Sequence, residues 1–207
     1  MHFAFLGTSG AIPSPARDTT ALVFVVNEGA LLVDCGGSPV RKLRRAGVDP
    51  LALAYVLITH LHPDHAYGLP SLVQNLMLMQ RAAPLTVLGH PEHVEPLRTL
   101  LGLFNLLERP GMFPLDVRAL DPAPGAPALA LGPLAVRTAP VEHGTMPNVA
   151  VRVDAARGRS VVYSSDTQPC DAVVRLARGA DPLIHEATFP DRHRGRFGAH
   201  TPAGEAG

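Results

Sequence analysis

Several features common in proteins are scarce or missing in this 207-residue sequence. It contains no tryptophan, one lysine (Lys42) and two cysteines, Cys35 and Cys170. Two cysteines are too few for a disulfide framework and fit a reducing compartment. No apolar run approaches the roughly 20 residues that a membrane span requires, and the start shows neither a basic leader nor an apolar stretch of signal length. We therefore expect a cytoplasmic protein without a membrane partner.

The chain also lacks net charge, because 18 basic residues balance 18 acidic ones. Nucleic-acid binding would therefore require a local basic patch or a metal ion. Hydrophobic residues make up 46% of the sequence, which is enough for a packed core and excludes wholesale disorder. The length predicts one domain over residues 1–207.

Short apolar runs alternate with helical patterns along the chain. The expected strands are His2–Leu6, Ala21–Val26, Ala30–Val33, Ala54–Thr59, Leu85–Leu88, Leu115–Leu120, Leu134–Val141, Val149–Val153, Ser160–Ser164 and Pro182–His185. The expected helices are Pro39–Ala46, Leu69–Arg81, Pro91–Leu107 and Ala172–Arg178. We interpret the connector Asp121–Pro127 as a surface loop rather than a domain boundary. The pattern predicts an α/β protein with two sheets and helices packed outside them.

Histidine is abundant against this background, with ten residues in the chain. The segment Ile58–His65 places His60 and His62 two residues apart at the end of an apolar strand, so that both side chains share one side. Asp64 and His65 follow in a turn. A single histidine at a strand end is usually a surface residue, but this group of imidazoles and a carboxylate predicts a site for zinc, iron or manganese.

The His-x-His-x-Asp-His pattern resembles the signature of the metallo-β-lactamase superfamily. Four other segments resemble the ribonuclease Z branch of that family: Leu6–Pro13, Asp34–Gly37, Tyr163–Cys170 and Leu183–Phe189. The resemblance covers the chain from about residue 3 to residue 206. It implies a four-layer αβ/βα sandwich, with metal ions at one rim of the two sheets.

The resemblance also implies a set of metal ligands. In that set His60, His62 and His143 hold one ion, Asp64 and His65 hold a second, and Asp166 bridges the two. The family chemistry implies two zinc ions per chain, with manganese or iron as alternatives, and hydrolysis by an activated water. Asp64 would also steer that water as a catalytic residue.

Two further features are open to two interpretations each. Asp34 is either the hydrogen-bond partner of a metal-binding histidine or a cap of the turn that follows it. Glu186 and His200 resemble family segments associated with proton donation to the leaving oxygen, so that Glu186 would hold His200 in place as a general acid. The other interpretation makes His200 a residue of a frayed tail.

The sequence departs from the family pattern in two places. The family's last metal ligand, a histidine on a later strand, has no counterpart before Gly207. Either the domain is incomplete at its C-terminus, or His200, water or a neighbouring subunit completes the second metal site. We therefore expect a weakly occupied second metal site, and the start of a helix at Thr201–Gly207. The interval from His143 to Asp166 is too short for the arm with which family members bind tRNA. The basic run Arg192–Arg196 is open to two interpretations: it either contacts phosphates or forms a solvated loop.

The leading hypothesis is a zinc-dependent phosphodiesterase of ribonuclease Z-like type, acting on small or single-stranded phosphodiesters, RNA among them. One alternative keeps the fold but changes the bond to a lactone, thioester or lactam. A second is a catalytically impaired metal-binding module. The resemblance also implies a homodimer, for which the apolar segment Leu69–Met79 is either an interface or a part of the core.

Overall fold

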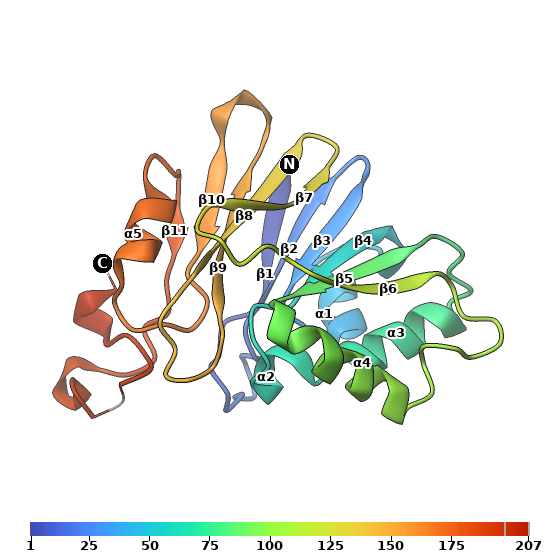
Figure 1. The fold of residues 1–207 in the computed structure, drawn as a ribbon, viewed down its shortest axis with the longest axis horizontal. Coiled ribbons are helices and arrows are strands. Elements are labelled where there is room, and N and C mark those ends of the chain that lie inside the picture. Colours follow the sequence, from blue (N-terminus) through green and yellow to red (C-terminus); the bar gives the residue numbers. More distant parts are fainter. Residues whose placement is uncertain (197, 207) are drawn as a thin grey trace. The chain divides into compact units, whose positions relative to one another are not determined.

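The computed structural model describes residues 1–196 and 198–206. The chain forms two compact units, unit 1 (Met1–Ala119) and unit 2 (Leu120–Gly207), and Gly207 lies outside the described residues. Each unit is built on one β-sheet, in line with the two sheets predicted (Figure 1). Within the described residues, no helix has the length and apolar character needed to cross a bilayer.

Unit 1 contains a six-stranded mixed sheet whose spatial order follows the chain. Its strands are β1 (His2–Gly7), β2 (Ala21–Val26), β3 (Gly29–Val33), β4 (Leu53–Leu57), β5 (Leu85–Gly89) and β6 (Leu115–Ala119). The first three strands pair antiparallel, and β3 to β6 pair parallel. Because parallel strands end at the same edge of a sheet, the residues that follow β3, β4 and β5 gather there.

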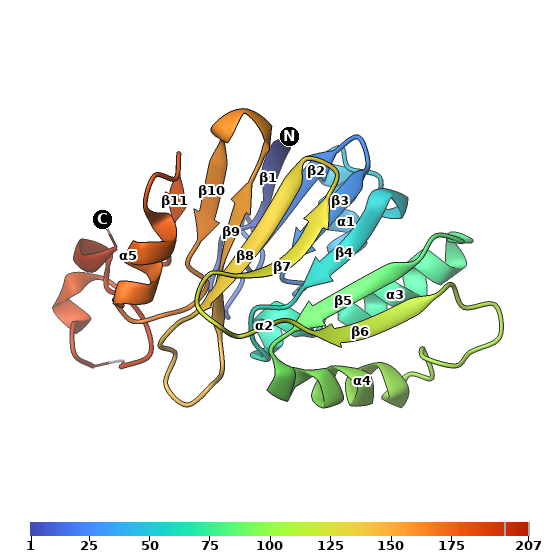
Figure 2. The same cartoon turned by 45° about the horizontal axis from the view of Figure 1, so that its top comes forward.

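Four helices accompany this sheet: α1 (Pro39–Arg45), α2 (Pro63–Ala66), α3 (Leu69–Leu78) and α4 (Val94–Leu103). Helices α1, α3 and α4 share one hydrophobic core with the sheet, and α4 runs beside β6 (Figure 2). Leu69, Leu72, Val73 and Leu76 of α3 are fully buried in this core. The apolar segment of α3 therefore serves mainly as core, although Leu78 at its end is 66% exposed.

Two helices are shorter than their apolar patterns predict. The helix expected over Leu69–Arg81 ends at Leu78, and the one expected over Pro91–Leu107 consists of a 3-10 turn, Pro91–His93, followed by α4. Gln80 and Asn105 adopt left-handed φ angles of 59° and 52° just beyond the two helix ends. A left-handed residue directs the chain away from the helix axis, which explains both early ends.

Unit 2 contains a five-stranded sheet in the order β11-β10-β9-β8-β7. Its strands are β7 (Ala126–Leu131), β8 (Leu134–Pro140), β9 (Val149–Asp154), β10 (Ser160–Tyr163) and β11 (Leu183–Ile184). The strands expected at Val149–Val153 and Ser160–Ser164 are confirmed as β9 and β10, which pair antiparallel as a hairpin, and α5 (Asp171–Ala177) packs on β8, β9 and β10. Strand β7 was not expected, because alanine and proline disfavour strands; Pro127 is tolerated in an edge strand.

The helix start expected at Thr201–Gly207 is not present in the described residues. A 3-10 turn at Ala203–Glu205 follows Pro202, which makes no side-chain cap. The Thr201 hydroxyl instead donates to the Thr167 carbonyl at 2.6 Å. Thr201 therefore takes part in a tertiary contact, and the cap position of the turn is occupied by Pro202, which has no side-chain acceptor.

A buried histidine interrupts the apolar packing beside the end of β5. His93 is 3% exposed, and neither of its ring nitrogens has a hydrogen-bond partner among the residues that the structure describes. Burial, together with the nearby His90, lowers the pKa of His93 to about 4. The ring is therefore neutral in the folded protein over a pH range in which an exposed histidine takes up a proton.

This burial predicts a specific acid sensitivity of the fold. The pKa of His93 is lower in the folded than in the unfolded state, so protons favour unfolding as the pH falls from about 6.5 towards 4. When the pH falls from 7 to 4.5, the unfolding free energy of the wild type should decrease by about 2 kcal/mol more than that of His93→Leu, which has no histidine to protonate at this position. Urea unfolding of the two proteins at both pH values checks this; an equal difference at both would contradict it.

Candidate functional site

The predicted metal-binding motif forms a compact group in unit 1, beyond the carboxyl end of β4. The chain leaves β4 and reaches His60, which is fully buried. His60 Nε2 and His62 Nδ1 lie 3.1 Å apart. Asp64 and His65 lie on α2, where Asp64 Oδ2 is 3.4 Å from His65 Nε2. These four side chains, His60, His62, Asp64 and His65, are called the first half-site below.

Asp34, which follows β3, holds the first half-site in place through hydrogen bonds to Thr59 and His65. Its buried carboxylate accepts hydrogen bonds from the Thr59 amide (2.9 Å) and the Thr59 hydroxyl (2.9 Å) through Oδ1. Oδ2 accepts from His65 Nδ1 at 2.8 Å. Of the two interpretations of Asp34, the structure therefore supports the histidine partner. Asp34 itself adopts a left-handed φ of 63°, a conformation that aspartate tolerates better than most residues.

These contacts fix which nitrogen of each ring carries the proton. Because a carboxylate only accepts, His65 Nδ1 donates to Asp34 and the lone pair of His65 is on Nε2. The Thr59 hydroxyl donates to Asp34, so it accepts from His60 Nδ1 at 3.1 Å. His60 therefore also carries its lone pair on Nε2. Hydrogen bonding of the remote nitrogen is the usual way in which proteins orient a histidine for metal binding.

The spacing of these donor atoms fits a divalent cation. Two ligands about 2.05 Å from a tetrahedral zinc lie roughly 3.3 Å from each other. The His60–His62 pair at 3.1 Å and the Asp64–His65 pair at 3.4 Å are both close to this value. The donor set of imidazoles with one carboxylate also suits zinc, iron or manganese better than calcium or magnesium.

A close backbone approach holds α2 against the loop that follows β3. The Cys35 amide donates to the His65 carbonyl at 2.7 Å, and the Gly68 amide donates to the Cys35 carbonyl at 2.8 Å. A Cβ atom at Gly36 would lie 1.8 Å from the Asp64 carbonyl oxygen, so this position requires glycine. Burial raises the pKa of the Cys35 thiol, which keeps this sulfur protonated and unsuited to metal binding.

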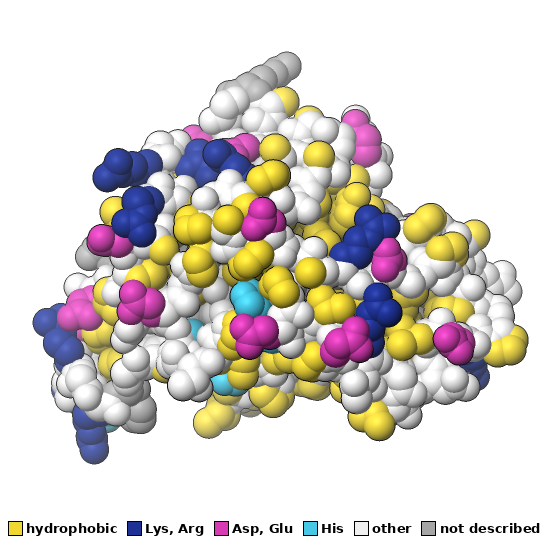
Figure 3. Space-filling model, viewed as in Figure 1, with side chains coloured by type: hydrophobic (Ala, Val, Ile, Leu, Met, Phe, Trp, Pro, Cys, Tyr) yellow, Lys and Arg dark blue, Asp and Glu magenta, His cyan; other side chains and the backbone are white. Residues whose placement is uncertain are grey.

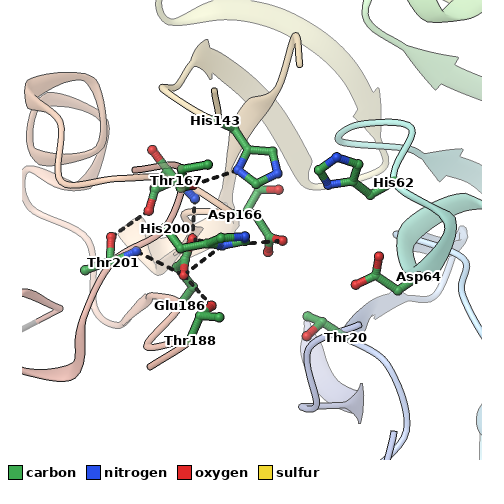
Figure 4. Close-up of polar contacts among 12 residues, drawn as sticks. Thr20, His62, Asp64, His143, Asp166, Thr167, Glu186, Thr188, His200 and Thr201 are labelled. Atoms are coloured by element: carbon green, nitrogen blue, oxygen red, sulfur yellow. Dashed lines mark hydrogen bonds and ion pairs between the residues drawn. The ribbon is translucent and has the colours of Figure 1, made fainter. Parts of the chain in front are cut away.

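A second group of predicted residues lies in unit 2. His143 follows β8 and Asp166 follows β10, and their ligand atoms lie within 4.8 Å of each other. His143 Nδ1 donates to the Ala199 carbonyl at 2.7 Å, so the lone pair of His143 is on Nε2. Figure 4 shows His143, Asp166 and His200 gathered together, with His200 Nδ1 4.0 Å from Asp166 Oδ2. His143, Asp166, Glu186 and His200 are called the second half-site below.

The Glu186 carboxylate of the second half-site accepts hydrogen bonds from four residues. His200 Nδ1 donates to Oε1 at 3.0 Å, and the Thr167 amide donates to the same oxygen at 2.5 Å. Oε2 accepts from the Thr188 hydroxyl and the Thr201 amide, at 2.5 and 3.2 Å (Figure 4). The predicted Glu186–His200 contact is therefore present. This ordered contact argues against the interpretation of His200 as a frayed tail residue.

Several supporting residues could not be identified from the sequence. Thr59 links Asp34 to His60, and its only signal was a β-branched hydroxyl residue directly before the histidine motif. Asn148 donates to the Asp166 carbonyl at 2.6 Å and accepts from Ser165, which has a left-handed φ of 55°. Left-handed non-glycine residues concentrate at functional sites, where the surrounding structure maintains them.

The basic Arg192–Arg196 run lies in an exposed loop with a 3-10 turn at Asp191–His193. Arg194 forms an ion pair with Glu205 at 3.0 Å. This pairing favours the interpretation as a solvated loop.

The chain matches known proteins over nearly its whole length. The family model described as "Beta-lactamase superfamily domain" matches residues 30–206. Ribonuclease Z from Methanosarcina acetivorans is 34% identical, with 99% of this chain and 81% of that protein covered. Ribonuclease Z from Pyrococcus abyssi is 30% identical over 243 residues, with 98% and 79% covered. That matched length exceeds the 207 residues of this chain, so the relative has internal segments that this chain lacks.

Solved structures give the same result at the level of the fold. The crystal structure of human tRNase Z, short form, matches with a TM-score of 0.80 at 24% identity, covering 99% of this chain and 85% of that one. A metallo-β-lactamase fold protein from Bacillus subtilis matches with a TM-score of 0.81 at 25% identity, covering 99% and 78%. The predicted fold class, the αβ/βα sandwich, is thereby confirmed. The chain belongs to the metallo-β-lactamase superfamily, in the branch that contains ribonuclease Z.

Proposed function

We propose that the protein is a metal-dependent phosphodiesterase of ribonuclease Z type, which hydrolyses RNA and small phosphodiesters. The observation that carries this proposal is the fixed ring orientation of three histidines. His60, His65 and His143 each donate from Nδ1 to a protein acceptor, which leaves Nε2 as the metal-binding atom. Histidines that bind metal ions in proteins are usually oriented in this way, and the relatives that share the fold are named ribonuclease Z.

The two half-sites would together hold two divalent cations, which we propose to be zinc. His60, His62 and His143 would bind the first ion, Asp64 and His65 the second, and Asp166 both. The second ion has fewer protein ligands, so we expect it to bind more weakly and to exchange more readily. When bound, such a pair of cations lowers the pKa of water and neutralises charge on a phosphodiester.

The residues of this chain then divide the proton transfers of hydrolysis. The Asp64 carboxylate accepts a hydrogen bond from the attacking water and directs its oxygen at phosphorus. As the bond from phosphorus to the leaving oxygen breaks, protonated His200 donates its proton to that oxygen. Glu186 stabilises the protonated form and holds the ring in place through the hydrogen bond at Nδ1.

The proposed substrates are single-stranded RNA and small diesters rather than folded tRNA. Ribonuclease Z relatives contain internal segments that are missing here, and the interval between His143 and Asp166 is occupied by the β9–β10 hairpin. Following the family resemblance, we further propose a homodimer in the cytoplasm.

The function is tested by hydrolysis of bis(p-nitrophenyl) phosphate. Protein loaded with zinc should cleave this diester, and EDTA should abolish the activity. Asp64→Ala should lower turnover by about 100-fold or more, because it removes both a metal ligand and the group that orients water. The unfolding free energy should change by less than about 1 kcal/mol, because Asp64 lies on the short helix α2 and is not part of the hydrophobic core.

Asp116→Ala, which removes an exposed carboxylate on β6, is the matched control and should leave turnover unchanged. The proposal fails if the zinc-loaded protein leaves the diester intact while cleaving a lactam or a thioester. A fully active Asp64→Ala variant would contradict the role given to Asp64.

The role of His200 predicts a dependence on the leaving group. A ribose oxygen is a poor leaving group that needs a proton, whereas p-nitrophenolate leaves readily without one. His200→Ala should therefore lower kcat about 100-fold on an oligoribonucleotide but only a few-fold on bis(p-nitrophenyl) phosphate. His185→Ala serves as a control, since in the described part of the chain the His185 ring bonds only from Nδ1 to the neighbouring Glu186 carbonyl. Equal losses of His200→Ala on the two substrates would show a structural role instead.

A further inference from the structure

Charged side chains are distributed unevenly over unit 1. Over α4 and β6, Figure 3 shows basic and acidic side chains next to each other, and the ion pairs Arg98–Glu95 and Arg118–Asp116 belong to these elements. Helix α1 is different, because it carries four basic residues and no acidic one. Among the described residues, Arg41 and Arg45 of this helix have no side-chain hydrogen bond and no carboxylate within 4.0 Å.

These two arginines line a cavity of about 320 Å³ within unit 1. Its walls come from the end of β1, the segment Ala16–Asp18 and α1. Arg17 lines it from the second of these segments and, like Arg41 and Arg45, has no side-chain partner among the described residues. Of the described residues in the wall, Asp18 alone carries a carboxylate, and it lies 3.6 Å from Lys42 Nζ. The cavity, which we call the arginine pocket, therefore contains one paired lysine and three arginines whose charges no carboxylate in the wall balances.

Helix stability alone does not account for this arrangement. Basic residues in the last turn of a helix favour the helix dipole, which suits Arg45. Arg41 lies one turn earlier on the same face, and like charges at this spacing destabilise a helix by a few tenths of a kcal/mol. Arg17 lies outside the helix and adds to the same repulsion. An anion in the pocket would remove it.

The arginine pocket lies directly behind the loop that supports the first half-site. Lys42 in its wall donates from Nζ to the Gly36 carbonyl and to the Thr19 carbonyl, both at 2.9 Å. Gly36 in turn packs against the Asp64 carbonyl so closely that no side chain fits between them. One backbone segment, Cys35–Gly37, thus separates the pocket from the proposed ligand Asp64. A nucleic-acid strand carries one phosphate per nucleotide, so a strand bound at the half-site presents further phosphates on both sides of the one that is cleaved.

We propose that the arginine pocket binds a backbone phosphate of an RNA strand, through the guanidinium groups of Arg17, Arg41 and Arg45. Guanidinium groups bind phosphate oxygens in a two-pronged geometry, and a locally basic pocket gives this uncharged chain a means of holding a polyanion. The proposal rests on the proposed function for the identity of the strand. Lys42 uses its donors on backbone oxygens and contributes charge rather than direct contact.

The test measures binding without catalysis. Anisotropy of a fluorescein-labelled single-stranded oligoribonucleotide is recorded in EDTA between 50 and 300 mM KCl, for the wild type and for Arg17→Gln/Arg41→Gln/Arg45→Gln. Loss of one or two phosphate contacts, each worth roughly 0.7 in the slope of log K against log salt, should flatten that slope by about 1. The same loss should weaken binding about tenfold at 100 mM KCl.

Arg118→Gln, on the opposite edge of the same sheet, is the control and should bind as the wild type does. Hydrolysis of bis(p-nitrophenyl) phosphate should be the same in all three proteins, because this small diester does not reach the pocket. If the wild type does not hydrolyse this diester, the proposed function is contradicted, whereas the anisotropy measurement still tests the pocket assignment. Equal affinity and equal salt slope in the wild type and the triple variant would overturn the pocket assignment. Loss of inorganic phosphate binding alone, with RNA binding unchanged, would overturn it in favour of a small phosphate ligand.

Discussion

The hydrogen bonds of the buried Asp34 carboxylate are the constraint on which the first half-site depends. Asp34 accepts from Thr59 and from His65, and through Thr59 it also orients His60. A buried carboxylate without donors would cost several kcal/mol, so each of these contacts is needed by Asp34 as much as by the histidines. The same contacts join the end of β3 to the end of β4 and to α2, and the left-handed backbone at Asp34 allows the carboxylate to point there.

Glu186 has the corresponding part in unit 2. Four donors surround its carboxylate, three of them from threonines, and the fourth is the ring of His200. Each unit therefore uses one carboxylate that is not a proposed ligand to fix the rings of neighbouring histidines. Since the loops that carry these residues have little regular structure of their own, hydrogen bonds to a central carboxylate provide the rigidity that the strands supply elsewhere. The histidine partners of the two carboxylates differ in exposure, because His65 is buried whereas the His200 side chain is 26% exposed.

Much of this arrangement could be predicted from the sequence, because its signals are local. The histidine motif, the apolar strands and the proline that opens α1 depend on residues close together in the chain. The role of Asp34 could not be decided, because its partner His65 is 31 positions away and a turn cap uses the same residue type. The position of Thr59 directly before the histidine motif was too weak a signal, since a threonine at a strand end is common. Strand β7 depends on the tolerance of a sheet edge for Pro127, which strand propensity does not reveal. The early ends of α3 and α4 depend on the left-handed backbone of Gln80 and Asn105, which helix propensity does not reveal. The pairing of Glu186 with His200 was predicted only through the family resemblance.

The central claim is that the two half-sites bind the same ions. A double-mutant cycle of zinc affinity tests it most directly, with His62→Ala in unit 1, Asp166→Ala in unit 2, and the two combined. If both side chains bind one ion, the second substitution should cost less once the first is made, with a coupling of at least about 1 kcal/mol. Costs that add to within about 0.5 kcal/mol would show that the half-sites act independently and would contradict the account.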